Sequence, residues 1–400
     1  MTDTTELAPL RLKKNEERRL RAGHLWVYSN EIDIAATPLK AFAAGQPVLI
    51  QAHNGKPLGT GYVNPNSLIC ARLVSRDHKY QLDRSLLIHR MKIALSLREQ
   101  LFKDPFYRLV YAESDGLPGL VIDRYGDVFV LQCTTAGMDN MRDAILEALE
   151  KLFKPRAIIL RNDSSIRKME GLEQTVETLG DLPEQVEIPE NKSRFRVALE
   201  GSQKTGWFYD QRMNRQRLTN YIRGKRVLDV FSYVGAWGVQ AAVHGAEQVF
   251  CVDSSATALT SLEENAAINN VADKVVTLQG DAFNALSQLR NEDEKFDVVI
   301  LDPPAFIKRR KDSKAGEQAY HRINQLGMRL LARDGILVSA SCSQQLAETQ
   351  LQKIVLQDSR HLDRTLQIVE RGHQGPDHPV HPAIPETAYL KALFCRLTRV

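Results

Sequence analysis

The stretch that decides the fold is RVLDVFSYVGAWG, residues 226–238. An apolar strand runs out near Asp229, and a loop with two glycines, Gly235 and Gly238, follows it. Glycine lets a backbone turn tightly and approach a ligand closely. The dinucleotide fingerprint GxGxxG would need a further glycine two residues before Gly235, where Tyr233 stands. The expected ligand of this loop is therefore not a pyrophosphate.

Strands and helices alternate around this loop, from about residue 196 to the C-terminus. A helical segment follows each of the apolar segments RVLDVF, QVFCVD, VVTLQG, FDVVILD and GILVSAS. This alternation predicts an α/β domain with a mostly parallel, Rossmann-like sheet and helices on both faces. No helix follows the tail AYLKALFCRLTRV (388–400), which is expected to close the sheet antiparallel.

The rest of the chain predicts two smaller domains. Residues 1–75 contain short strands separated by Gly, Asn and Pro, which is typical of a small β-barrel. Residues 78–104 carry apolar side chains at helical spacing. From 107 to 200, short strands mix with one helix (137–153) in an α+β pattern, and the polar segment 171–195 indicates a connector or hairpin. The expected domains are residues 1–75, 76–195 and 196–400.

The composition is that of an ordinary globular protein, with 43% hydrophobic and 26% charged residues among 400. No apolar run approaches the roughly 20 residues of a membrane helix, and the N-terminus lacks the apolar core of a secretion signal. Five cysteines stand far apart, at positions 70, 133, 251, 342 and 395, without a CxxC pair. This spacing argues against disulfides and against a zinc site, so a reducing cytoplasm is the expected location.

Basic residues gather in two short clusters, residues 11–24 and 306–314, although the net charge is only +4. Such clusters can meet phosphates. For either cluster alone, a solvated surface is the better interpretation.

Acidic residues stand at four strand ends, where open α/β sheets bind their ligands. They are Asp229, Asp253, Asp281 and Asp302. Asp253 follows the glycine loop by roughly 20 residues, a spacing that suits a carboxylate bound to ribose hydroxyls. Asp281 is placed to accept a hydrogen bond from an adenine amino group. Each one alone could be a helix N-cap. Four aspartates at successive strand ends favour a ligand that contains adenosine and no phosphates. S-adenosylmethionine is such a ligand, and its sulfonium is positively charged. The expected cofactor contacts are Gln211, Asp229, Phe231, Ser232, Tyr233, Gly235, Gly238, Asp253, Ser254, Asp281, Ala282 and Asp302.

Five motifs together carry a resemblance to a known family: YAESDGLPGLVIDRYGD (111–127), KTGWFYDQRMNR (204–215), VLDVFSYVGAWG (227–238), LDPPAF (301–306) and SASCS (339–343). They resemble the bacterial ribosomal RNA large subunit methyltransferase I family, over nearly the whole chain. The resemblance implies a class I S-adenosylmethionine-dependent methyltransferase domain that makes 5-methylcytosine in 23S rRNA. It also implies an N-terminal PUA domain, an RNA-binding β-barrel whose opening pattern AGHLWVYSNEI (22–32) matches.

A cysteine at a strand end fits this chemistry. Carbon 5 of a pyrimidine is a poor nucleophile, and a thiolate that adds to carbon 6 activates it, which is covalent catalysis. Cys342 ends the strand that follows the strand of Asp302, so the two residues should lie at neighbouring strand ends. The resembled family places its nucleophile in SASCS, where Cys342 matches it. The alternative interpretation of Cys342 is core packing. Two roles are considered for Asp302. It could hold a proton against ring N3 of the base during the addition, or it could cap and structure its own loop.

The residues after Asp302 are expected to meet the RNA. A base in a duplex must be flipped out to reach such a pocket, and basic side chains can hold the flanking phosphates. The expected substrate contacts are Pro303, Pro304, Phe306, Lys308, Arg309 and Arg310. In enzymes that methylate exocyclic amines an aromatic residue follows the prolines directly. Here Ala305 intervenes before Phe306, which argues against methylation of an amine without excluding it.

Two other functions stay open from the sequence. One is methylation of a guanine or an exocyclic amine, with Cys342 structural. The other is an RNA-binding protein with a relict cofactor domain, against which the glycine loop and the four aspartates argue. The expected partners are 23S rRNA and, in a homodimer, a second copy of the chain, with no membrane.

Overall fold

The computed structural model describes residues 7–201 and 205–399, so Lys204 of the 204–215 motif lies outside the described residues. The chain divides into two compact units. Unit 1 comprises residues 1–184, 201–207 and 376–387, and unit 2 comprises residues 185–200, 208–375 and 388–400.

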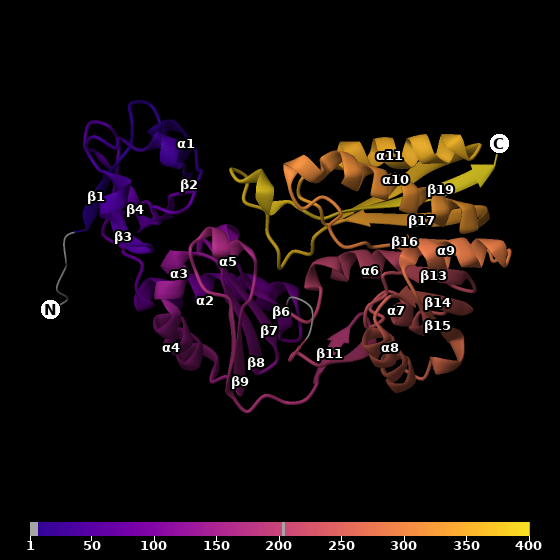
Figure 1. Ribbon diagram of the computed structural model, residues 1–400. Coiled ribbons are helices and arrows are strands. Elements are labelled where there is room, and N and C mark those ends of the chain that lie inside the picture. The colour runs from indigo at the N-terminus through magenta and orange to yellow at the C-terminus, as the bar shows by residue number, and fades with distance from the viewer. Residues whose placement is uncertain (1–6, 202–204, 400) are drawn as a thin grey trace. The chain divides into compact units, whose positions relative to one another are not determined.

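The first sheet of unit 1 has five strands in the order β1-β3-β4-β5-β2 (indigo in Figure 1). Alternate residues of β3, Val48 and Ile50, are buried in an apolar core, as the two-residue period of a strand requires. Its elements are β1 (Ala8–Arg11), α1 (Glu17–Arg21), β2 (Trp26–Val27), β3 (Gln46–Gln51), β4 (Pro57–Val63) and β5 (Ala71–Ser75).

The second sheet of unit 1 runs in the order β10-β9-β8-β7-β6, and only the pair β8–β9 is parallel. Its strands are β6 (Phe106–Tyr111), β7 (Leu120–Tyr125), β8 (Val128–Cys133), β9 (Ala157–Asn162) and β10 (Thr175–Gly180). Its helices are α2 (Arg84–Leu101), α3 (Ala136–Asn140), α4 (Arg142–Phe153) and α5 (Ile166–Met169), with the 3-10 turn η3 (Ala112–Asp115). Helix α2 begins later than predicted because Asp83 caps it, and the helix predicted over 137–153 is divided at Met141.

Buried polar contacts join the two sheets of unit 1. The Tyr62 hydroxyl donates to the carbonyl of Pro118 at 2.7 Å, and Asn64 Nδ2 donates to Glu170 Oε2 at 2.8 Å. A Cβ on Gly137 would stand 2.2 Å from the Tyr62 ring, so only glycine allows this approach. The first sheet is therefore fixed to the second by specific contacts.

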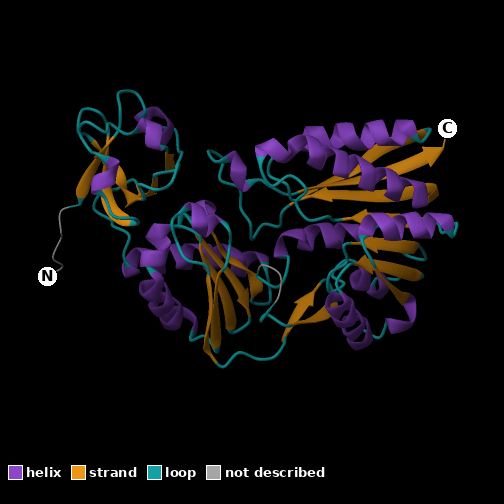
Figure 2. Ribbon diagram, in the orientation of Figure 1, coloured by secondary structure: helices purple, strands orange, loops and turns teal. Residues whose placement is uncertain are grey.

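Unit 2 contains a seven-stranded sheet in the order β15-β14-β13-β16-β17-β19-β18, with helices on both faces (Figures 1 and 2). All of its strand pairs are parallel except those of β19. Its strands are β13 (Arg226–Val230), β14 (Gln248–Asp253), β15 (Val275–Gln279), β16 (Phe296–Leu301), β17 (Leu331–Ser341), β18 (Arg364–His373) and β19 (Lys391–Arg399). Its helices are α6 (Arg212–Leu218), α7 (Gly238–Val243), α8 (Ala256–Ile268), α9 (Ala282–Asn291), α10 (Ser313–Leu330) and α11 (Glu348–His361).

The α/β fold with a mostly parallel sheet is as predicted, but one detail of the C-terminal tail is wrong. Strand β19 is antiparallel as expected, yet it inserts between β17 and β18 and does not form the edge. The edge strand is β18, which was not predicted because its sequence RTLQIVERGH alternates polar and apolar residues and has no apolar run. The polar segment 171–195 contributes β10 to unit 1 and begins the hairpin of β11 (Val186–Glu190) and β12 (Ser193–Val197).

Among the described residues, no helix combines the length and the apolar character needed to cross a membrane.

Candidate active site

The parallel strands of unit 2 bring the predicted site residues to one edge of the sheet. Strands β14, β13, β16 and β17 are adjacent in that order, and their carboxyl ends lead to Asp253, the glycine loop, Asp302 and Cys342. The prediction that the strands of Asp302 and Cys342 are neighbours is confirmed, since Leu301 pairs with Ser339. This edge is where open α/β sheets bind ligands.

The glycine loop has the backbone that its sequence requires. Gly235 has a φ of 87°, and a Cβ there would stand 2.7 Å from Leu262. Phe231 and Tyr233 also have positive φ values, of 68° and 52°, which is strained for such residues. Ser232 holds the loop by donating its hydroxyl to the carbonyls of Asp229 at 3.0 Å and Val252 at 2.9 Å. The loop is thus held in a tight, preformed turn.

Asp253 braces the same loop. Its two carboxylate oxygens each accept a backbone N–H, from Tyr233 and from Ser255, both at 2.9 Å. Asp253 is not the cap of α8, because that role belongs to Ser255, whose hydroxyl accepts from the N–H of Ala258. Ser254 lies exposed beside it. Asp253 is half-buried and therefore open to a ligand on one side.

The carboxyl group of Asp229 is buried and only partly hydrogen-bonded. Its Oδ2 accepts the N–H of Gly238 at 2.9 Å, whereas its Oδ1 has no hydrogen-bond partner among the described residues. Burial raises the pKa of Asp229 to about 8, and the carboxylates of Asp302 and Asp253 add to the effect. A buried, unsatisfied carboxyl is costly unless a ligand completes it.

Asp302 lies at the centre of a hydrogen-bonded group. Gln211 Nε2 donates to its Oδ1 at 2.9 Å, and the Trp237 indole donates to its Oδ2 at 3.0 Å. Asn214 in turn donates to Gln211 at 2.7 Å and fixes its orientation. Burial raises the pKa of Asp302 to about 6, and the nearby Asp210 carboxylate acts in the same direction. Asp302 can therefore gain or lose a proton near neutral pH.

Asp281 and Ala282 begin helix α9. Asp281 is an exposed N-cap that accepts the N–H groups of Phe283 and Asn284 at 3.0 and 3.2 Å. The capping role considered from the sequence is therefore present.

Cys342 differs from the other four cysteines in its surroundings. It is half-buried, whereas Cys70, Cys133, Cys251 and Cys395 are buried. Its Sγ lies 4.0 Å from the carbonyl oxygen of Pro303, directly after Asp302.

The loop of Cys342 is tied to the loop after the prolines. Ser343 Oγ accepts the N–H of Ile307 at 3.1 Å, and the Tyr320 hydroxyl contacts the hydroxyls of Ser341 and Ser343 at 2.8 and 2.9 Å. These hydrogen bonds tie the loop of Cys342 to the loop that follows the prolines.

A lysine that the sequence analysis missed lies beside this thiol. Lys391 is 6% exposed and donates from Nζ to the carbonyls of Ser343 at 2.5 Å and Tyr389 at 2.9 Å. Burial lowers the pKa of Lys391 to about 8, and the charge interaction with Cys342 opposes that shift. Nothing near Cys342 in the sequence signals this lysine, because it arrives on β19. Trp237, in contrast, stands in the glycine loop and could have been proposed as a partner of Asp302.

The predicted RNA contacts differ in exposure. Lys308, Arg309 and Arg310 are exposed, and Arg309 pairs with Asp312 at 3.2 Å. Pro303 is buried and Pro304 exposed, while the Phe306 ring packs 4.9 Å from that of Tyr320. Phe306 is thus part of an aromatic cluster that also supports the site.

Comparisons with known proteins agree with this description. Residues 164–396 match a family described as S-adenosylmethionine-dependent methyltransferase, and residues 10–76 match the PUA-like domain. Ribosomal RNA large subunit methyltransferase I of Shewanella denitrificans is 39% identical over 97% of this chain and 99% of its own length. The protein of the same name from Klebsiella pneumoniae is 37% identical over 99% of this chain and 100% of its own length.

Two solved structures share the fold across the chain. The methyltransferase SMU.776 complexed with SAH has a TM-score of 0.83 at 23% identity, over 98% of this chain and 100% of its own. An S-adenosylmethionine-dependent methyltransferase from Streptococcus mutans has a TM-score of 0.81 at 22% identity, with the same coverage.

Proposed function

The chain belongs to the ribosomal RNA large subunit methyltransferase I family, and we propose that it methylates carbon 5 of a cytosine in 23S rRNA through a covalent adduct of Cys342. It is an S-adenosylmethionine-dependent ribosomal RNA methyltransferase. The observation that carries the finer proposal is the position of Cys342. It is the half-buried cysteine of the chain, at the strand end next to that of Asp302.

The residues at the sheet edge fit the cofactor. The unpartnered, buried Oδ1 of Asp229 is suited to a positively charged group, and Asp253 offers a half-exposed carboxylate for ribose hydroxyls. The bound cofactor supplies a methyl group on a sulfonium. We assign its binding to the loop from Phe231 to Gly238, with Ser254, Asp281, Ala282 and Gln211 around it.

The proposed reaction begins at the thiol. The Cys342 thiolate adds to carbon 6 of the cytosine while Asp302 gives a proton to ring N3, so that carbon 5 becomes nucleophilic. Carbon 5 then takes the methyl group and gives its proton to a base. The carbon–sulfur bond breaks as the thiolate leaves, and ring N3 returns its proton to Asp302. The hydrogen bonds from Gln211 and Trp237 keep the Asp302 carboxyl in one orientation throughout.

Lys391 is proposed to favour the thiolate form of Cys342. A nearby ammonium stabilises a thiolate by its charge. The Lys391 ammonium also donates to the carbonyl of Ser343, the residue after Cys342, and so ties β19 to the loop of the thiol.

We expect Lys391→Met to slow the alkylation of Cys342 by iodoacetamide about 10-fold at pH 7, because the thiolate loses its positive neighbour. The other four cysteines are buried, so the reaction reports on Cys342. The difference from the wild type should shrink above pH 8, since Lys391, with a pKa of about 8, then becomes neutral in the wild type as well. Lys353→Met, which removes an exposed lysine of α11, is the control. Equal alkylation rates at pH 7 would contradict this role.

Two kinds of contact are proposed to hold the ribosomal RNA. The exposed Lys308, Arg309 and Arg310 would meet phosphates beside the flipped base, with Pro304 and Phe306 near it. The PUA-like sheet of unit 1 would add an RNA-binding surface. A ribosomal RNA substrate also supports the expected cytoplasmic location. The expected homodimer stays a prediction, which light scattering would test.

Nucleoside mass spectrometry tests the proposed function directly. Purified enzyme, a 23S rRNA transcript and S-adenosylmethionine carrying a labelled methyl group should yield labelled 5-methylcytidine. Label in a methylated guanosine or in an amine-methylated nucleoside would overturn the choice of atom and leave the family assignment intact.

A further inference from the structure

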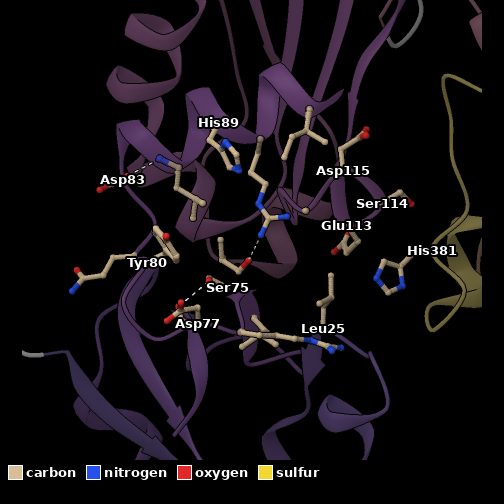
Figure 3. A pocket seen from close by; sticks show the side chains of 18 of the residues that line it. Leu25, Ser75, Asp77, Tyr80, Asp83, His89, Glu113, Ser114, Asp115 and His381 are labelled. Carbon is tan, nitrogen blue, oxygen red and sulfur yellow. Dashed lines mark hydrogen bonds between the residues drawn. The ribbon is translucent and has the colours of Figure 1, made fainter. Parts of the chain in front are cut away.

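Unit 1 contains a cavity of about 1250 Å³ that the proposed reaction does not use (Figure 3). Its walls are the end of β5 with the segment after it (73–81), one face of α2 and the turn η3, with His381 from the 376–387 segment. Pockets for small ligands typically measure roughly 300–1,000 Å³. This cavity is therefore large enough for an extended ligand.

Cations without a carboxylate partner line the cavity. Arg76, Lys79 and Arg90 form no salt bridge within the part of the chain that the structure describes. Arg76 and Lys79 are exposed, whereas Arg90 is half-buried and makes only a long hydrogen bond of 3.4 Å to the carbonyl of Val74. These three side chains present positive charge to a ligand.

Two of the four carboxylates of the lining are paired with arginines. Asp115 accepts from both terminal nitrogens of Arg98 at 2.7 Å, and Glu113 accepts from the Trp26 indole at 2.8 Å. Asp77 and Asp83 accept backbone N–H groups of the turn before α2 and of its first turn. Asp115 and Glu113 are thus offset by Arg98 and Arg72, at 2.7 and 4.0 Å, whereas Asp77 and Asp83 keep their negative charge. The three cations exceed these two unpaired carboxylates by one, a small positive excess that favours an anionic ligand.

Apolar and aromatic surface lies beside these cations. The Tyr80 ring is 59% exposed and stands at the cavity (Figure 3), and Ile93 and Leu97 on α2 are 52% and 37% exposed. Two buried polar atoms of the lining, Arg90 Nε and Ser114 Oγ, have no hydrogen-bond partner among the described residues. The cavity thus combines phosphate-binding groups, a stacking surface and unmet hydrogen-bonding capacity.

From this combination we infer that the cavity of unit 1 binds a single-stranded segment of the ribosomal RNA outside the methylated nucleotide. Single-stranded RNA is held by cations along its backbone and by aromatic side chains on which its bases stack. A small anion would use the cations and leave the Tyr80 surface without a function. The inference rests on the ribosomal RNA substrate and not on the atom that is methylated.

The test compares two RNAs and two matched double variants of the full-length enzyme. Arg76→Glu with Lys79→Glu reverses two exposed charges of the cavity. Lys92→Glu with Lys103→Glu reverses two exposed charges of unit 1 that do not line it. One RNA is a 23S rRNA fragment with single-stranded flanks around the methylated nucleotide, and the other is a short hairpin without those flanks.

We expect the cavity variant to bind the flanked fragment about 10-fold more weakly and to bind the hairpin like the wild type. The slope of log affinity against log salt should fall by about 1.4, at about 0.7 for each single-strand phosphate that the variant no longer neutralises. Tyr80→Ala should weaken binding of the flanked fragment about 10-fold because its ring no longer stacks on a base, with the salt slope unchanged. The control variant should match the wild type on both RNAs.

Three results would overturn the inference. The first is that the cavity variant binds the flanked fragment as tightly as the wild type does. The second is that the control variant loses as much affinity for this fragment as the cavity variant. The third is that the cavity variant loses as much affinity for the hairpin as for the flanked fragment. If RNA binding stays normal while binding to a ribosomal protein is lost, the cavity is a protein-binding site. These binding measurements need no turnover. They can therefore be interpreted even if the enzyme proves to methylate an atom other than carbon 5 of cytosine.

Discussion

Cys342→Ser is expected to lose methyl transfer by roughly 10⁴-fold or more, because a hydroxyl cannot replace the thiolate that adds to carbon 6. Cofactor affinity and folding should be unchanged, since Cys342 is half-buried and serine is nearly the same size. Single-turnover methylation of 23S rRNA, with calorimetry of S-adenosylmethionine binding as the folding control, measures both. If Cys342 only filled space, the variant would lose about 1–3 kcal/mol of stability at most and keep its rate.

A trapped adduct would identify the nucleophile independently of the rate. RNA with 5-fluorocytosine at the target position has no proton to lose from carbon 5, so the enzyme should stay covalently joined to it after methyl transfer. Peptide mass spectrometry should place the RNA on Cys342, and Cys342→Ser should form no adduct. An adduct on another cysteine, or near wild-type turnover by Cys342→Ser, would refute the assignment and bring the guanine or amine alternatives forward.

Asp302→Asn should have the second largest effect, a loss of roughly 10²–10³-fold in the methylation rate at saturating RNA and cofactor. An amide has the shape of the carboxyl group and still bonds to a ring nitrogen, but it cannot give a proton to N3. The Gln211 and Trp237 side chains, which now donate to the carboxylate, would keep one acceptor. A thermal melt and a cofactor titration separate this catalytic loss from a loss of structure.

The pH profile gives a second measure of Asp302. Burial raises the pKa of its carboxyl to about 6, so the acid form needed for N3 is lost progressively as the pH rises above that value. The thiolate that attack at carbon 6 requires becomes scarcer as the pH falls. The wild-type rate should therefore fall on both sides of an optimum. For Asp302→Asn the rate should rise with pH to a plateau, and a profile that still falls at high pH would exclude Asp302 as the acid.

The sequence alone was enough for the architecture of unit 2 because its signals are local. Alternating apolar strands and helices predict a parallel sheet, and parallel strands bring their carboxyl ends to one edge. Asp253, Asp302 and Cys342 could thus be placed together before any of their neighbours in space was known. Strand β18 was not predicted because an edge strand of alternating polar and apolar residues lacks the continuous apolar run that marks a buried strand.

The sequence by itself determined the α/β fold, the glycine loop and the candidate nucleophile, since each depends on residues that are neighbours in the chain. Only the tertiary structure decided what surrounds these groups. Trp237 and Gln211 reach Asp302 across 65 and 91 positions, and Lys391 reaches the Cys342 loop across 48. The cavity of unit 1 likewise joins the segment after β5, helix α2 and His381, which are up to about 300 residues apart. Hydrogen bonds, burial and charge interactions act through space, so their effects on pKa and reactivity appear only when distant segments are packed together.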